Sequence, residues 1–348
     1  MSELRQDRTS GAWVIVAPER RLRPRQGAER GGTRPNRKSF DPECPFCPGA
    51  EARLPGIIDE VPCETAPGWQ LRVVPNKFPA LRPDAAPLPA RHDGRTLPGY
   101  GYHEVVIESA RHDVELSGMS DHEIGIVTAA YKRRFAELAR PRIECIVLFR
   151  NQGASSGASL VHPHAQLLAL AVTPPEIRAR LAWAEAWHRD HGRCVLCDEM
   201  EIERGSRTRL IRETEHFVAT VPFAASSPCE MWVTPRRHHA SFAGASDAEM
   251  REIGPLLRDL LIRLKLAHGT LPFQLVLDSV LPGQNLLPDQ HWRLRIVPVL
   301  TVPGGFERAS GMPINPSLPE DDAERLRTVG PAPTIRAEDG SAPGPIRL

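Results

Sequence analysis

The sequence predicts an α+β fold of two similar halves, each an antiparallel sheet packed by a helix. The main observation is an internal repeat, because a series of features returns in the same order along the chain. A second is that both predicted helices open with a serine followed three residues later by a glutamate, a capping box. The repeated features, in the first and then the second half, are a Cys-x-x-Cys pair (44–47, 194–197), a capping box (120–123, 246–249) and a histidine-bearing strand (162–166, 291–295).

The chain of 348 residues is long enough for two ordinary domains, and 41% hydrophobic residues support a packed core. We place the first half at residues 1–175, the second at 176–315 and a tail at 316–348. The tail is rich in proline, glycine and charge, so we expect one short helix near residues 321–326 and then disorder.

Composition and charge narrow the class of substrate. The chain has 44 Lys and Arg against 43 Asp and Glu, a net charge of +1. This balance gives no general electrostatic drive toward nucleic acid or membranes, so we expect small-molecule substrates and neither of those partners. The first residues are charged, without the apolar core of a signal peptide, and no apolar run approaches bilayer length. We therefore expect a cytoplasmic protein.

The elements of the two halves are predicted from apolar runs, turn residues and capping signals. We call each tight Cys-x-x-Cys turn a knuckle and the strand at 162–166 the histidine strand. In the first half the elements are a strand at 13–16, the knuckle at 44–47, a strand at 71–75 with Asn76 in the following turn, a strand at 103–108, a helix from Ser120, a buried strand at 145–149 and the histidine strand. In the second half they are the knuckle at 194–197, a strand at 230–233, a helix from Ser246, a buried strand at 273–277 and a strand at 290–294.

The histidine strand holds the residues that we expect to take part in the reaction. Residues alternate between the two faces of a strand, so His162, His164 and Gln166 are expected on one face. Residues 151–159 just upstream are small and glycine-rich, and such a backbone can aim N–H groups at an anion. Imidazole beside a phosphate indicates phosphoryl or nucleotidyl transfer. The competing interpretation is that the two histidines are ordinary surface or core residues.

Comparison of the halves separates two roles on this strand. The first histidine of the strand returns in the second half, whereas Arg293 and Arg295 stand in place of His164 and Gln166. Each half thus keeps two cysteines and two histidines, a set typical of a structural zinc site, and only the first half keeps a nucleophile. The predicted zinc ligands are Cys44, Cys47, His112 and His162 in the first half, and Cys194, Cys197, His238 and His291 in the second.

Two alternatives stay open for the metal sites. A lone Cys-x-x-Cys pair could be redox-active instead. In the second half, His239 or a water could replace a ligand, or the pair could be vestigial and empty.

Several motifs together resemble the galactose-1-phosphate uridylyltransferase family, within the histidine-triad superfamily. They are residues 9–20, the knuckle at 44–47, Asn76, residues 151–166 and Gly305-Phe306-Glu307. The resemblance implies two tandem histidine-triad-like halves and a ping-pong reaction. In it His164 attacks the α-phosphate of UDP-glucose, glucose 1-phosphate leaves, and galactose 1-phosphate takes the uridylyl group.

The resemblance also implies roles for particular residues. Gln166 would bind the phosphoryl oxygens, and the active site would form between the subunits of a homodimer. Residues implied to hold the nucleotide and phosphates are Arg20, Arg23, Asn76, Asn151, Gly157 and Ser159, and those implied to hold the hexose are Phe306 and Glu307. Thr301 and Pro313 stand where some members use lysine and glutamine on the sugar phosphate, so the hexose phosphate is left open.

The sequence leaves three other functions open. Residues 305–316 look more like the family branch that includes a plant ADP-glucose phosphorylase, which carries AMP on the same histidine and passes it to phosphate. A nucleotide hydrolase would release the nucleotide to water. A zinc-stabilised module that binds nucleic acid or a partner protein is a different class, and 5% aromatic residues argue against a base-stacking surface.

Overall fold

The computed structural model describes residues 1–22, 38–85 and 96–330. The strands of these residues are β1 (Glu3–Gln6), β2 (Trp13–Val16), β3 (Asp59–Pro62), β4 (Trp69–Pro75), β5 (Gly101–Ile107), β6 (Cys145–Gln152), β7 (His164–Leu170), β8 (Leu210–Glu213), β9 (Phe217–Thr220), β10 (Met231–Pro235), β11 (Phe273–Asp278), β12 (Arg293–Pro298) and β13 (Ile314–Asn315). The α-helices are α1 (Asp121–Glu137), α2 (Pro175–His191), α3 (Val195–Ser206), α4 (Asp247–His268), α5 (Gly305–Ser310) and α6 (Pro319–Thr328).

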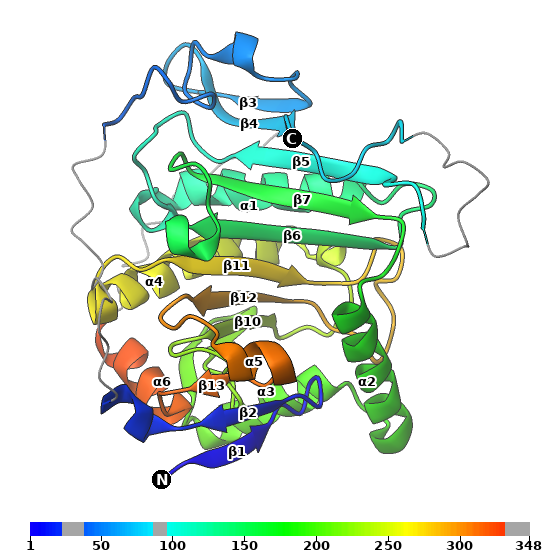
Figure 1. Ribbon diagram of the computed structural model, residues 1–348, viewed down its shortest axis with the longest axis vertical. Helices are drawn as coiled ribbons and strands as arrows, with labels where there is room; N and C mark the ends of the chain where they lie inside the picture. Colours follow the sequence, from blue (N-terminus) through cyan, green and yellow to red (C-terminus); the bar gives the residue numbers. More distant parts are fainter. Residues whose placement is uncertain (23–37, 86–95, 331–348) are drawn as a thin grey trace, which may run out of the picture.

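The sheet confirms the predicted repeat and joins the two halves. Its strand order is β3-β4-β5-β7-β6-β11-β12-β10-β9-β8, so the first five strands and the last five have the same topology read from opposite edges. Every pairing in this sheet is antiparallel. The halves meet where β6 pairs with β11, and the two predicted sheets are therefore one continuous sheet (Figure 1).

Helices α1 and α4 lie behind this sheet in Figure 1 and cover one of its faces. Both begin with the predicted capping box, at Ser120 and at Ser246. Their apolar sides pack on alternate strand residues, such as Ala165 and Leu167 of β7, which are fully buried. Burial of this apolar face is the main favourable term in the stability of the fold. The intervening strand residues, His164 and Gln166 among them, face the other side of the sheet.

A small second sheet joins strands from the beginning of the chain and from the region before α6. Strand β2 lies between β1 and β13, and β13 runs parallel to β2. Helix α6 includes the short helix predicted in the tail, and its residues Ala323 and Leu326 are fully buried in the main core. Residues 331–348, where disorder was predicted, lie outside the described residues. The boundaries at 175 and 315 stay predictions.

The start of β7 corrects one expectation. His162 was expected on the same strand as His164, but β7 begins at His164, and His162 lies in the bend before it. Pro163 between them has no N–H group to donate to a neighbouring strand, so the regular pairing begins one residue later. The neighbouring strand β5 likewise ends at Ile107, opposite His164. The bend frees the ring of His162 from the face on which His164 lies.

None of the helices formed by the described residues is long and apolar enough to cross a membrane.

Candidate functional site

The four predicted metal ligands of the first half converge in the structure. Cys44, Cys47, His112 and His162 are all buried, with their ligand atoms within 4.8 Å of one another. The Cys47 Sγ lies 3.5 Å from Nδ1 of His112 and 3.7 Å from Nδ1 of His162. A tetrahedral zinc with the usual bond lengths has sulfur and nitrogen ligands about 3.5 Å apart. The cluster therefore has the size of a tetrahedral metal site.

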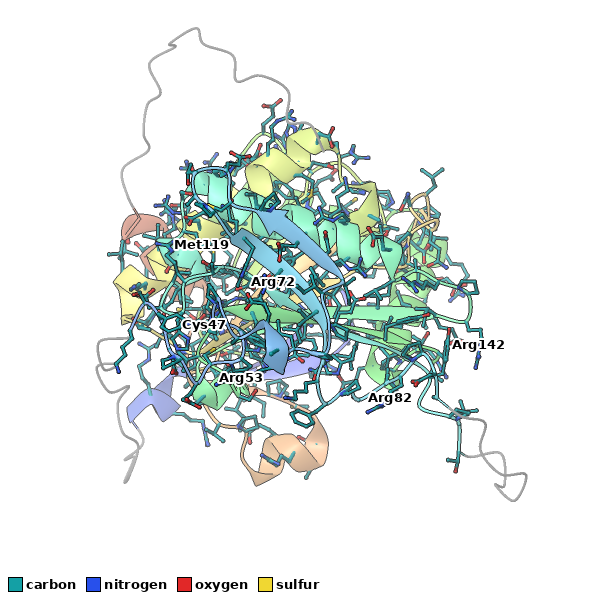
Figure 2. The ribbon with its side chains drawn as sticks, turned by 90° about the horizontal axis from the view of Figure 1, so that it is seen from above. Cys47, Arg53, Arg72, Arg82, Met119 and Arg142 are labelled. Carbon is teal, nitrogen blue, oxygen red and sulfur yellow. The ribbon has the colours of Figure 1, made fainter. Side chains whose placement is uncertain are left out.

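The surroundings of this cluster also suit a cation. The Nε2–H of His162 donates to the Ser109 carbonyl at 2.7 Å, which leaves Nδ1 unprotonated and facing the cysteines. Burial raises the pKa of the Cys44 thiol to about 11, so a thiolate there requires a compensating positive charge. In Figure 2 Cys47 lies on the side of the sheet away from α1 and α4, near Arg53.

The second cluster has the same composition and geometry. Cys194, Cys197, His238 and His291 place their ligand atoms within 4.8 Å of one another. The Cys197 Sγ lies 3.4 Å from Nδ1 of His238 and 3.5 Å from Nδ1 of His291. The alternative ligand His239 is not part of this cluster, because its Nε2 accepts a hydrogen bond from the indole of Trp292 at 2.9 Å. Residues 1–22, 38–85 and 96–330 therefore contain two four-residue groups that could hold a metal ion.

The ring of His164 has one nitrogen bonded to the backbone and one nitrogen without a partner among the described residues. Its Nδ1 lies 2.8 Å from the carbonyl oxygen of His162, which can only accept, so Nδ1 carries the proton and Nε2 carries the lone pair. Burial lowers the pKa of the ring below the ordinary histidine value, which keeps it neutral near pH 7. Nε2 makes no hydrogen bond to the described residues, although the side chain is only 6% exposed. The described residues thus leave this lone pair free to attack an electrophile.

Gln166 lies two residues further along β7, on the same face as His164. Its Oε1 is 2.8 Å from Nε2 of His103 on β5 and 3.4 Å from the amide nitrogen of Asn76. Asn76 is a predicted nucleotide-binding residue, whereas the sequence predicts only that His103 begins a strand. The signal that could have pointed to His103 is a polar residue alternating with Val105 and Ile107 on one face of its strand.

The glycine-rich segment leads from β6 to His162. Asn151 is the next-to-last residue of β6, and the backbone then turns through Gly153 and Gly157, both with positive φ values, 87° and 96°. The positive φ at Gly157 favours glycine. A Cβ atom there would lie 3.4 Å from the Asn151 side-chain nitrogen, so these two predicted phosphate-binding residues are neighbours. Ser159 is exposed in the same segment.

The other predicted substrate residues lie elsewhere in the chain. Arg20 is exposed on the short helix η1 (Pro18–Leu22), which directly follows β2. Phe306 and Glu307 are on α5, which directly precedes β13. Because β2 and β13 are paired, these residues lie next to the small sheet in the chain, and Figure 1 shows α5 over the second half, away from β7. Arg23 lies outside the described residues.

In the second half the corresponding strand position holds a salt-bridge cluster. Arg295 pairs with Val276 as Gln166 pairs with Phe149, so Asp278 occupies the position of Asn151. The Asp278 carboxylate accepts from Arg293 at 3.0 Å and from Arg180 at 2.7 Å. Arg293 stands at the position of His164, and an internal carboxylate already neutralises it. Of these two equivalent positions, the first therefore carries an imidazole and the second a salt-bridged guanidinium.

Comparison with known proteins agrees with this geometry. Residues 1–174 match the family described as galactose-1-phosphate uridyl transferase, N-terminal domain. An ADP-glucose phosphorylase from Arabidopsis thaliana is 37% identical over 333 residues, covering 94% of this chain and 93% of that protein. A galactose-1-phosphate uridylyltransferase from Thermotoga maritima is 28% identical over 338 residues, covering 94% of this chain and 98% of that protein.

Solved structures show the same relationship. The crystal structure of an ADP-glucose phosphorylase from Arabidopsis thaliana with bound ADP-glucose has a TM-score of 0.80 and 36% identity, covering 94% of this chain and 99% of that chain. The match thus extends over both halves and includes the segment of the histidine strand. The chain belongs to the galactose-1-phosphate uridylyltransferase family of nucleotidyltransferases.

Proposed function

We propose that the protein transfers a nucleotidyl group through a covalent intermediate on Nε2 of His164. The observation that carries this proposal is the state of that ring, whose Nδ1 proton is held by the His162 carbonyl while Nε2 has no partner among the described residues. The lone pair of Nε2 attacks the α-phosphorus of a nucleoside diphosphate glucose. The bond from this phosphorus to the bridging oxygen breaks, and glucose 1-phosphate leaves.

The residues around His164 serve this step in different ways. The ring becomes positively charged as the bond to phosphorus forms, and the carbonyl of His162 then accepts a stronger hydrogen bond from Nδ1–H. The NH₂ group of Gln166 donates to the phosphoryl oxygens. Asn151 and Gly157 hold the neighbouring phosphate. Zinc, held by Cys44, Cys47, His112 and His162, would supply a structural cross-link that fixes the bend before β7.

We propose ADP-glucose as the donor and inorganic phosphate as the acceptor. Phosphate attacks the adenylyl-histidine, the bond between nitrogen and phosphorus breaks, and ADP leaves with His164 restored. The support is the similarity to the ADP-glucose phosphorylase of Arabidopsis thaliana, at 37% identity and a TM-score of 0.80. Residues 305–316, which resemble that branch, support the same choice.

The second candidate is the reaction first predicted from the motifs, transfer of UMP from UDP-glucose to galactose 1-phosphate. It is supported by the family match over residues 1–174 and by the relative from Thermotoga maritima at 28% identity. Both reactions use the same histidine and release glucose 1-phosphate in the first step. They differ in the base and in the acceptor.

The test is to incubate the protein with ADP-glucose or UDP-glucose alone and to measure the mass of the intact chain by mass spectrometry. We expect a stoichiometric gain of AMP from ADP-glucose and a slower or smaller gain of UMP from UDP-glucose. The His164→Ala variant should gain neither, whereas His122→Ala, at an exposed position away from β7, should behave like wild type. Faster labelling by UDP-glucose would reverse the choice of donor, and continuous release of AMP or UMP would indicate a hydrolase. Labelling of His164→Ala would contradict the mechanism.

We further propose that the active site is completed by a second copy of the chain in a homodimer. The support is the separation of α5, which carries Phe306, and of β2, which precedes Arg20, from β7, which begins at His164 (Figure 1). Phe306 is 48% exposed, which leaves its ring available to another subunit.

A further inference from the structure

We propose that His103 is a positioning residue that orients the side-chain amide of Gln166 for the reaction at His164. His103 donates its Nε2–H to Oε1 of Gln166 and thereby turns the NH₂ group toward the phosphoryl oxygens. This inference rests on the proposed nucleotidyl transfer, and it adds a residue that acts through Gln166 and is not among the predicted substrate-binding residues. It is carried by three hydrogen bonds that join β5, β7 and the turn after β4.

The first of these bonds determines which nitrogen of His103 carries the proton. The backbone N–H of Ala80 donates to Nδ1 of His103 at 3.1 Å. A backbone amide can only donate, so Nδ1 must hold the lone pair and Nε2 the proton of the neutral ring. Burial lowers the pKa of this ring, which favours the neutral form near pH 7.

The second bond determines the orientation of Gln166. Because Nε2 of His103 is a donor, the atom of Gln166 at 2.8 Å from it must be the carbonyl oxygen. A flipped amide would place two N–H donors against each other. The oxygen end of Gln166 is therefore held at His103, and its NH₂ group, which makes no bond to the described residues, is left for substrate.

The third bond comes from Asn76 and agrees with this orientation. Its Oδ1 accepts from the Phe78 backbone N–H at 2.8 Å, so its NH₂ group points to the pair of His103 and Gln166. That NH₂ group lies 3.1 Å from Nε2 of His103 and 3.4 Å from Oε1 of Gln166. Since His103 Nε2 carries a proton, the acceptor for Asn76 is the oxygen of Gln166. Two donors thus hold this oxygen.

We expect the orientation of Gln166 by His103 to stabilise the transition state of the transfer. The phosphoryl oxygens gain negative charge as the bond to His164 forms, so a donor aimed at them acts more strongly there than in the bound substrate. Without His103 the amide of Gln166 can rotate, and part of that stabilisation is lost. We expect the rate of nucleotidyl-enzyme formation to fall about tenfold, with donor affinity changed less than about twofold.

The experiment measures single-turnover labelling of the full-length protein by saturating ADP-glucose or UDP-glucose, whichever labels the wild type. The His103→Phe variant keeps a planar ring but removes the donor. The His103→Gln variant returns an N–H group near the position of Nε2, and we expect its rate within about threefold of wild type. The matched control is His122→Phe, at an exposed position outside the site. Metal content and unfolding midpoint are recorded for each variant.

A double-mutant cycle tests whether His103 acts through Gln166. We expect Gln166→Leu to slow labelling about a hundredfold, and addition of His103→Phe to slow it no further. Independent, additive losses, equal failure of His103→Gln and His103→Phe, or a loss in donor affinity alone would each overturn the inference. These results differ from failure of the proposed function, in which wild type is not labelled or His164→Ala still is.

Discussion

Three histidines on β7, just before it and on the neighbouring β5 each use one ring nitrogen to bind a backbone group. His162 donates to the Ser109 carbonyl at 2.7 Å, and His164 donates to the carbonyl of His162 at 2.8 Å. His103 accepts from the Ala80 N–H at 3.1 Å. Each bond selects a tautomer, so the remaining nitrogen carries a lone pair in His162 and His164 and a proton in His103. Hydrogen bonds to the backbone thus give three identical side chains different arrangements of proton and lone pair.

In the second half, the positions equivalent to His164 and Gln166 belong to a salt-bridge cluster around Asp278. Asp278 is surrounded by Arg293, Arg295 and Arg180, with nitrogen-to-oxygen distances of 3.0, 3.0 and 2.7 Å. Burial alone would raise the pKa of the Asp278 carboxyl, but these arginines outweigh burial and hold it well below its usual range. The carboxylate therefore stays charged, and its role is in stability.

This arrangement predicts that Asp278→Asn destabilises the protein by about 3 kcal/mol at pH 7, because it leaves buried arginines without a counter-charge. A carboxyl with a lowered pKa stabilises the folded state above the pKa of the unfolded chain, and this contribution is lost as the pH falls. The difference between wild type and variant should therefore be largest above about pH 4 and shrink below it. Urea unfolding at several pH values measures this difference.

The control for this prediction is Asp84→Asn, at an exposed position, which should have no measurable effect. An Asp278→Asn variant as stable as wild type at pH 7, or a difference that grows on acidification, would contradict it.

At the scale of elements, the two knuckles use different local structures for the same ligands. Cys44 and Cys47 lie in a turn, whereas Cys194 is the N-cap of α3 and Cys197 lies in its first turn. In both, two residues between the cysteines bring their sulfurs to one side. In the first group His162 lies two residues before His164, whereas in the second group His291 lies two residues before Arg293. Loss of metal should therefore have different effects in the two halves.

We expect two zinc ions per chain by elemental analysis, one for each ligand group. The Cys44→Ser variant should lose one ion and also slow nucleotidyl transfer at least about tenfold, because the bend that positions His164 is released. The Cys197→Ser variant should lose the other ion and lower the unfolding midpoint, with nucleotidyl transfer within about twofold of wild type.

Cys63→Ser, outside both groups, is the control for metal content and should retain both ions. Fewer than two ions in wild type, or full metal content in Cys197→Ser, would show that the second group is not a zinc site.

At the scale of the whole molecule, the pairing of β6 with β11 places the two halves side by side in one sheet. The face opposite α1 and α4 carries His164 in the first half and supports α5 in the second (Figure 1). One chain therefore presents the proposed nucleophile and, at a distance from it, residues implied to hold the hexose. Two copies related by a twofold axis could each supply what the other lacks.

A complementation experiment tests this arrangement. One chain carries His164→Ala and the other carries Phe306→Ala with Glu307→Ala, and heterodimers are isolated with two different affinity tags. If the site is shared, one of the two sites in each heterodimer is intact, so we expect about half of the wild-type turnover.

Heterodimers assembled from two differently tagged His164→Ala chains are the control and should be inactive. If the site is formed within one chain, the mixed heterodimer will be as inactive as this control, and the shared site is then wrong.

The sequence alone determined the features that depend on local pattern and on residue chemistry. The capping boxes at Ser120 and Ser246 predicted the starts of α1 and α4, because the signal and the hydrogen bonds lie within four residues. The internal repeat predicted the two groups of cysteines and histidines that converge in the structure, because cysteine and histidine at matching positions have few other shared uses. The repeat also distinguishes His164 from the other strand histidines, since Arg293 stands in its place in the second half, and its catalytic role stays a prediction.

Only the tertiary structure decided which distant residues meet. His103 reaches Gln166 because β5 pairs with β7, and the two residues are 63 positions apart in the chain. The joining of the two sheets through β6 and β11 and the separation of Phe306 from His164 likewise depend on long-range strand pairing. Local patterns cannot specify such pairings, because the order of strands in a sheet is decided by the burial of whole faces.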